Sequence, residues 1–216
     1  MLQFAASIAL AFVVLIFAEG ILKYSKKKRS PEVSRKLVHM SHGIAAAIWP
    51  FFVAYKIIIA IEVLFLLLAA LARKFRFFKG ISQVDRISGG EIFFPLGIIT
   101  VALMNPSKWV FSAAMLVLAL ADAAAALIGK RYGKHQFTVF GNKKSLEGSL
   151  AFVVVSFFII GWVVLVAPSG FETLWPLVIL LPLVTAAVEA AAPFGLDNFL
   201  IPVVVALVLN SVQLIN

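Results

Sequence analysis

Eight apolar stretches follow one another along almost the whole chain, and they constrain its fold more than any other feature. Hydrophobic residues make up 62% of the 216 residues and charged residues only 13%, and the mean hydropathy is +1.06. A soluble domain of this length needs far more polar surface, so we predict a single integral membrane domain over 1–216. The stretches occupy roughly 2–22, 37–54, 56–72, 91–104, 109–128, 147–167, 174–192 and 198–215.

The stretches lack the alternation of barrel strands, so we predict an all-α, multi-pass fold of about eight transmembrane helices. Several are shorter than the roughly 20 residues that cross a bilayer unaided. Such helices tilt, thin the membrane locally or line a hydrated cavity. The chain contains no cysteine, which excludes disulfides and thiolate metal sites.

The basic residues predict how these helices are oriented. Seven lie in 23–36, five in 73–90 and five in 129–148, which leaves only Lys56 and Lys108 of the 19 on the other side. By the positive-inside rule the three basic loops are cytoplasmic, and both chain ends lie on the non-cytoplasmic side. Topology therefore accounts for the net charge of +9, and no nucleic-acid partner is expected.

Six of the ten acidic residues are predicted to gather at the cytoplasmic face. An ionisable group at membrane depth costs roughly 2.5–3.5 kcal/mol on insertion scales, so each one requires a counter-charge, a cation or water. We therefore expect a polar cavity that attracts metal ions and opens to the cytoplasm. Glu62 lies in the outer half of its helix and is expected to be structural. The six are Glu19, Glu91, Asp122, Glu147, Glu189 and Asp197.

These acids are not equally strong candidates for a functional role. Asp122 lies among alanines with no basic residue within one helical turn, which favours a functional role. Glu147 follows Ser145 at the start of a helix, where capping and the helix dipole alone could explain it. Glu19 could simply pair with Lys23 one turn later.

Small residues extend the face of the helix that carries Asp122. Ala126, Gly129 and Gly133 follow Asp122 at intervals that place all four on one side of a helix. Such a face lets a neighbouring helix approach closely, and it would equally let a phosphate reach backbone N–H groups. The spacing does not choose between the two. A soluble phosphate-binding loop is excluded, because three residues rather than four separate the glycines and no strand precedes them.

The stretch "DAAAALIGKRYGKHQF…NKKSLEGSLAFV", which begins at Asp122, resembles the family of polytopic CTP-dependent lipid kinases. That family includes phytol kinase, dolichol kinase and CTP-dependent diacylglycerol kinase, and it is distantly related to phosphatidate cytidylyltransferases. Three further stretches look like the same family: "SRKLVHMSHG" (34–43), "GGEIFFPLG" (89–97) and "EAAAPFGLDNFLIP" (189–202). The resemblance implies transfer of the γ-phosphate of CTP to the hydroxyl of a membrane alcohol, at an active site facing the cytoplasm.

Phosphoryl transfer requires divalent cations, a positive clamp for the phosphates and a carboxylate near the attacking hydroxyl. With oxygen ligands and no cysteine, the cation is expected to be Mg²⁺ or Mn²⁺. The expected catalytic residues are Asp122, Glu147 and Glu91, and the expected metal ligands are Asp122, Glu147, Glu189 and Asp197. Nucleotide and phosphate binding is expected from Arg35, Lys36, His39, Gly129, Gly133, Lys143, Lys144 and Ser145, with Asn198 as a further polar residue of the site.

Other functions are less favoured. The C-terminal stretch lacks the "HGG" and "DR" elements of CDP-lipid-forming cytidylyltransferases. A small cation transporter would distribute its acids along a path, whereas here they gather at one face beside a basic loop that suits a polyanion. The chain lacks the additional segments expected of dolichol kinase, so an isoprenoid alcohol such as phytol or geranylgeraniol is favoured over dolichol or diacylglycerol. For His39, the position of a polar residue beside the membrane is as good an explanation as phosphate binding.

Overall fold

The structure is a computed structural model that describes residues 31–75, 89–167 and 174–215, with the backbone alone at 31–35, 72–75 and 213–215. The predicted first helix over 2–22, with Glu19, lies outside the described residues. Each later predicted stretch coincides with a helix or with a continuous helical run, so the all-α prediction is confirmed. The number of transmembrane helices and their orientation remain predictions. The helices are α2 (Pro31–Ile48), α3 (Tyr55–Phe75), α4 (Gly90–Leu103), α5 (Lys108–Leu116), α6 (Asp122–Tyr132), α7 (Leu146–Val166), α8 (Trp175–Ala191) and α9 (Asp197–Ile215).

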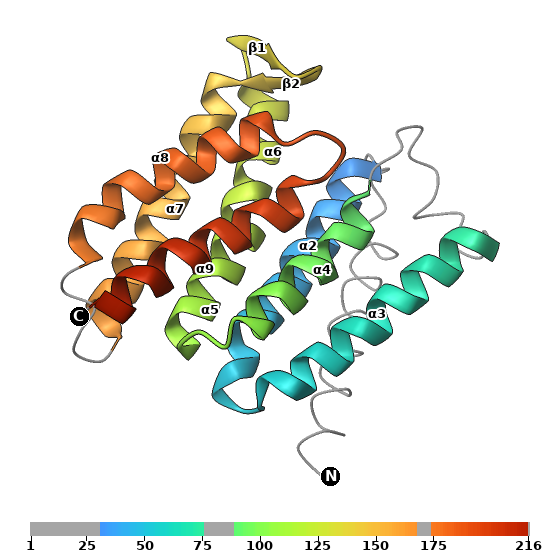
Figure 1. The fold of residues 1–216 in the computed structure, drawn as a ribbon. Coiled ribbons are helices and arrows are strands. Elements are labelled where there is room, and N and C mark those ends of the chain that lie inside the picture. Colours follow the sequence, from blue (N-terminus) through green and yellow to red (C-terminus); the bar gives the residue numbers. More distant parts are fainter. Residues whose placement is uncertain (1–30, 76–88, 168–173, 216) are drawn as a thin grey trace.

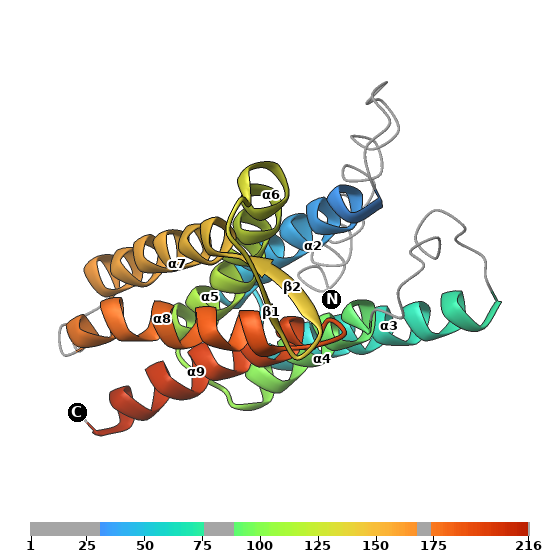
Figure 2. The ribbon, with the colours of Figure 1, turned by 90° about the horizontal axis from the view of Figure 1, so that it is seen from above.

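A continuous helical run over α5 and α6 forms the centre of the molecule (Figures 1 and 2). It begins at Ser107, whose hydroxyl accepts a hydrogen bond from the Val110 N–H at 3.3 Å. A π-helical turn, η2 (Val117–Ala121), joins its two parts. The run packs against α2, α7 and α9, and the Phe111 and Met115 side chains of α5 are fully buried. Asp122 lies within this run, directly after η2, and its side chain is buried.

Many apolar side chains point outward rather than into this core. Helix α3 packs on α4 at one edge of the molecule (Figure 1), and its leucines Leu64, Leu67, Leu68 and Leu71 are 44–56% exposed. Two described helical runs are long and apolar enough to cross a bilayer, Lys108–Tyr132 and Leu146–Val166, and three described apolar helices are shorter. Outward-facing apolar helices of this kind suit contact with lipid rather than with water.

A β-hairpin stands between α6 and α7, where the sequence had predicted only a basic loop. Strands β1 (Gln136–Val139) and β2 (Asn142–Ser145) pair antiparallel, with Val139 opposite Asn142. The two turn residues, Phe140 and Gly141, have φ angles of 45° and 82°, which is the left-handed geometry of a tight hairpin turn. The hairpin lies beyond the helix ends at one extremity of the fold (Figure 1).

Candidate active site

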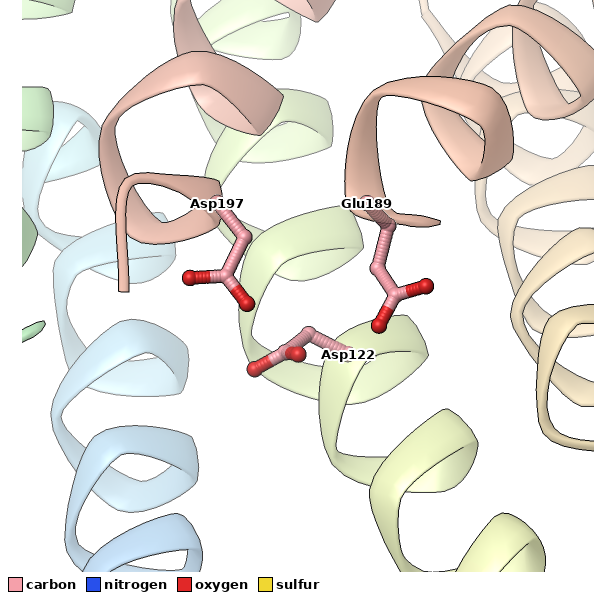
Figure 3. A group of neighbouring side chains, drawn as sticks. All are labelled: Asp122, Glu189 and Asp197. Atoms are coloured by element: carbon pink, nitrogen blue, oxygen red, sulfur yellow. The ribbon is translucent and has the colours of Figure 1, made fainter. Parts of the chain in front are cut away.

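Three buried carboxylates converge where α6, α8 and α9 meet. One oxygen each from Asp122, Glu189 and Asp197 lies within 4.8 Å of the others, and Figure 3 shows the three side chains pointing toward one another. Asp122 and Glu189 are each 4% exposed and Asp197 is 9% exposed. We call these three residues the carboxylate group. The structure thus brings together three of the six acids that the sequence predicted to gather at one face.

Local backbone features bring the three side chains together. The π-helical turn η2 ends directly before Asp122 and changes the register of the run at that point. Glu189 lies in the last turn of α8. The connection from α8 to α9 turns sharply through Phe194 and Gly195, which both have positive φ, so that Asp197 opens α9 beside the end of α8.

Two lysines from other elements neutralise part of this charge. Lys36 of α2 forms an ion pair with Asp122, and Lys144 of β2 forms an ion pair with Glu189. Two lysines against three carboxylates leave one formal negative charge in excess within these five side chains. Asp197 in particular faces like charges from Asp122 and Glu189. A group with this balance favours a bound cation.

The other predicted phosphate-binding residues surround the carboxylate group to different degrees. Along β2, Lys143 is exposed while Lys144 is half-buried, because successive residues of a strand point to opposite faces. His39 stacks on Phe94, with ring centroids 4.7 Å apart, and it acts electrostatically on Asp122. Arg35, whose side chain is not described, directly precedes Lys36 in α2.

Glu147 lies apart from the carboxylate group. Its carboxylate accepts hydrogen bonds from the His135 N–H at 3.2 and 3.3 Å, and it contacts the imidazole Nδ1 at 2.8 Å. Glu147 thus ties the segment before β1 to the start of α7, and the structure does not place it beside Asp122. Glu91, in the first turn of α4, is likewise not a member of the carboxylate group.

The glycines predicted on the Asp122 face allow α6 and α7 to approach each other. A Cβ atom on Gly129 would lie 3.0 Å from the Ser145 Oγ, and one on Gly148 would lie 2.8 Å from the Ala125 carbonyl oxygen. A Cβ on Gly133 would collide with the Gly129 carbonyl oxygen. Ser145 itself caps α7 by accepting a hydrogen bond from the Gly148 N–H at 3.1 Å. Close packing is thus observed for this face, and phosphate binding there stays a prediction.

Asn198 lies next to Asp197 and is 2% exposed. Its backbone N–H donates to the Asp197 Oδ1 at 3.0 Å, and its side-chain amide donates to the Gly195 carbonyl oxygen at 3.1 Å. The amide thereby holds the turn that positions Asp197. Within the described residues its own Oδ1 has no hydrogen-bond partner, which leaves an acceptor near the carboxylate group.

Sequence reasoning missed one buried polar pair entirely. Glu62, expected to be structural, is fully buried, and its Oε1 lies 2.7 Å from the Nε2 of His42. The available signal was the recurrence of histidine three residues after His39, which places two imidazoles on one side of α2.

The fold and the site together define a class: an apolar helical protein with buried carboxylates balanced by lysines from neighbouring elements. Comparison with known proteins then identifies the family of the chain. The chain is 32% identical over 183 residues to a phytol kinase from Synechocystis sp., a match that covers 82% of this chain and 78% of the relative. It is 40% identical over 68 residues to a dolichol kinase from Saccharomyces cerevisiae, covering 32% of this chain and 12% of that protein. No family model and no solved structure matches the chain.

The chain belongs to the polyprenol and phytol kinase family. This membership and the apolar helices together indicate a membrane protein.

Proposed function

We propose that this protein is a lipid kinase that transfers the γ-phosphate of CTP to the hydroxyl of a long-chain membrane alcohol. The observation that carries the proposal is the carboxylate group with its two lysines, placed beside the hairpin in a chain of the phytol kinase family. Carboxylates for a cation and lysines for phosphates are the parts that phosphoryl transfer requires.

The donor set of the carboxylate group suits a hard divalent cation. Asp122, Glu189 and Asp197 offer only oxygen ligands, at mutual distances below 4.8 Å and with excess negative charge, which suits Mg²⁺ or Mn²⁺. These three residues would hold the ion. When bound, such an ion neutralises charge on the phosphate oxygens.

The lysines are placed to bind the nucleotide phosphates. Lys144 reaches Glu189 from the hairpin, and Lys36 reaches Asp122 from α2, so both ammonium groups lie at the edge of the carboxylate group. A triphosphate entering there offers each lysine a second anionic partner. Lysine is a common phosphate ligand because its ammonium group is a compact charge with three donors.

We assign to Asp122 the role of orienting the hydroxyl group of the acceptor alcohol. Asp122 lies buried on the central run, and we place there the lipid hydroxyl that arrives from the apolar side to meet the phosphates. The alcohol oxygen forms a bond to the γ-phosphorus as the bond from that phosphorus to the bridging oxygen breaks, and CDP leaves. The carboxylate orients the hydroxyl and takes up its proton, although most of the catalysis lies in positioning and charge neutralisation.

The acceptor that we favour is an isoprenoid alcohol of the phytol or geranylgeraniol type. The match to a phytol kinase extends over most of both chains, whereas the match to a dolichol kinase covers a small part of that protein. We also propose that the protein crosses the membrane several times with the site facing the cytoplasm, which agrees with the distribution of basic residues.

The test is an assay of purified protein in lipid nanodiscs with CTP labelled at either the α- or the γ-phosphate, Mg²⁺, and a panel of phytol, geranylgeraniol, dolichol and diacylglycerol. We expect the γ-label to move to an alcohol of the isoprenoid type and ATP to replace CTP poorly. Transfer of the α-label would instead identify a cytidylyltransferase. Absence of any labelled lipid across the panel would overturn the proposal and favour a transporter.

A further inference from the structure

A second buried polar site lies at the junction of α2, α3 and α4. Glu62 is 0% exposed and bonds to His42 through one oxygen only, while its Oε2 has no hydrogen-bond partner within the described residues. The indole N–H of Trp49, which is 2% exposed, also has no partner there. The Trp49 ring lies beside the same imidazole that bonds to Glu62, with the Trp49 and His42 ring centroids 6.0 Å apart.

These two groups specify the chemistry of a ligand. A buried donor or acceptor without a partner destabilises the fold, and the apolar surroundings supply no bulk water to satisfy it. A hydroxyl group has the chemistry to serve each of them, since it donates one hydrogen bond and accepts others. A carbonyl group would satisfy Trp49 but not Glu62, and an ammonium group would satisfy Glu62 but not Trp49.

The walls of this site are aromatic and suit a hydrocarbon chain. The Phe65 and Phe94 ring centroids lie 4.8 and 5.2 Å from that of His42. Helix α3, which carries Glu62, presents exposed leucines on its outer face. The polar groups are therefore one helix away from the surroundings in which a lipid is dissolved.

The site also adjoins the carboxylate group. The Phe94 ring contacts the rings of both His42 and His39, and His39 lies about one turn of α2 after Lys36, the ion-pair partner of Asp122. Along α2, His42 follows Lys36 by six residues, which corresponds to about 9 Å of helix. A hydroxyl at Glu62 is thus about two turns deeper than the ion pair of Lys36 with Asp122.

We propose that Glu62, His42 and Trp49 form a holding site for the hydroxyl group of a lipid alcohol. The alcohol donates its hydrogen bond to the Glu62 Oε2 and accepts one from the Trp49 N–H, while His42 fixes the carboxylate. This inference rests on the proposed function, and it makes the three residues determinants of acceptor binding rather than of the chemical step. A bound water molecule has the same hydrogen-bonding chemistry, and the experiment distinguishes the two.

Two conservative variants test the site by kinetics. Glu62→Gln retains size and removes the anionic acceptor, and Trp49→Phe retains the aromatic ring and removes the donor. We expect each to raise the KM for the alcohol, by roughly tenfold for Glu62→Gln, with kcat and the KM for CTP within about twofold of wild type. Ser156→Ala is the control, because its hydroxyl is also fully buried without a partner in the described residues but lies on α7. Unchanged KM for the alcohol in both folded variants would overturn the proposal.

A binding measurement separates this inference from the proposed function. Geranylgeraniol carrying a photoreactive diazirine near its hydroxyl is cross-linked to the wild-type protein, and the labelled peptides are mapped by mass spectrometry. We expect labelling around Glu62, His42 and Trp49 that free geranylgeraniol suppresses and its methyl ether does not. Labelling here without phosphate transfer would refute the kinase and retain the site. Labelling only elsewhere, or equal suppression by the methyl ether, would overturn the proposal. The Glu62–His42 pair would then hold a water molecule or simply join α2 to α3.

Discussion

Lys144 on the hairpin forms an ion pair with Glu189 near the end of α8, and this pair joins the basic loop to the carboxylate group. The hairpin is also held by Asn142, whose side-chain amide donates to the Ala192 carbonyl oxygen at 3.1 Å. Both contacts fall on β2 and fix its position against α8, which runs beneath the hairpin in Figure 2. The alternation of the strand then directs Lys144 inward and Lys143 to solvent.

Replacing Lys144 by Ala therefore tests where the nucleotide binds. We expect the KM for CTP to rise by roughly tenfold or more, because a charge-assisted contact to phosphate is lost, while the KM for the alcohol changes by less than about twofold. Lys134→Ala is the matched control, since Lys134 is exposed and lies outside the hairpin strands. Equal effects of the two substitutions would show that the loop attracts CTP only by its overall charge.

Metal dependence is the second prediction. Chelation by EDTA is expected to abolish activity, and added Mg²⁺ or Mn²⁺ to restore it. Electron paramagnetic resonance of Mn²⁺ measures the site directly. Asp197→Asn and Glu189→Gln are each expected to weaken Mn²⁺ binding by roughly tenfold or more, because each removes one charged oxygen ligand. Even substitution of the groups that support metal ligands typically lowers metal affinity by about 10- to 100-fold.

Glu147→Gln provides the contrast in the same experiment. Its carboxylate contacts His135 rather than the carboxylate group, so Mn²⁺ affinity is expected to stay within about twofold of wild type. A large loss of Mn²⁺ affinity in this variant would restore Glu147 as a metal ligand, which is the role predicted from the sequence alone.

Helix positions were predictable from the sequence because apolar stretches of this length and composition have few alternatives. The sequence predicted that six acids gather at one face, since charges at helix ends on one side of a membrane must meet or be solvated. It did not predict which of them meet, and the structure groups Asp122, Glu189 and Asp197 while Glu91 and Glu147 lie outside the group. The partners of these acids were not predictable. Lys36 lies 86 residues from Asp122, and the pairing depends on which helices pack together rather than on local spacing.

Local irregularities of the backbone were also not predictable from sequence patterns. The π-helical turn Val117–Ala121 has no apolar period that distinguishes it from the helix around it. The hairpin turn uses Phe140 and Gly141, whereas asparagine or aspartate usually precedes glycine in such turns. The partner of Glu62 was not predictable either, because a lone acid in an apolar helix shows no partner until the helix that carries His42 is placed beside it.

The third prediction concerns the close contact between α6 and α7. Gly148→Ala is expected to destabilise the protein by about 1–3 kcal/mol, because the added methyl group would lie 2.8 Å from the Ala125 backbone carbonyl oxygen. Gly161→Ala on the same helix is the control, since its added Cβ atom would meet Val178 at an ordinary 3.5 Å. Thermal unfolding in nanodiscs compares the two, and an equal effect would show that the glycine contact is not tightly packed.

The last prediction separates the charge of Asp122 from its structural role. Asp122→Asn removes the carboxylate that forms the ion pair with the buried ammonium group of Lys36, and breaking a buried pair in this way typically costs about 3–5 kcal/mol. A loss of activity in the single variant would therefore combine misfolding with lost catalysis. The double variant Lys36→Met, Asp122→Asn removes both charges and retains both volumes, so its thermal stability is expected to recover most of the loss. Its turnover at saturating CTP and Mg²⁺ is expected to stay at least roughly 10²-fold below wild type, because the carboxylate that orients the hydroxyl and the lysine assigned to the phosphates are both absent. Recovery of turnover together with stability would show that the pair serves the fold alone, and the acceptor would then have to be oriented by Asp197 or Glu189.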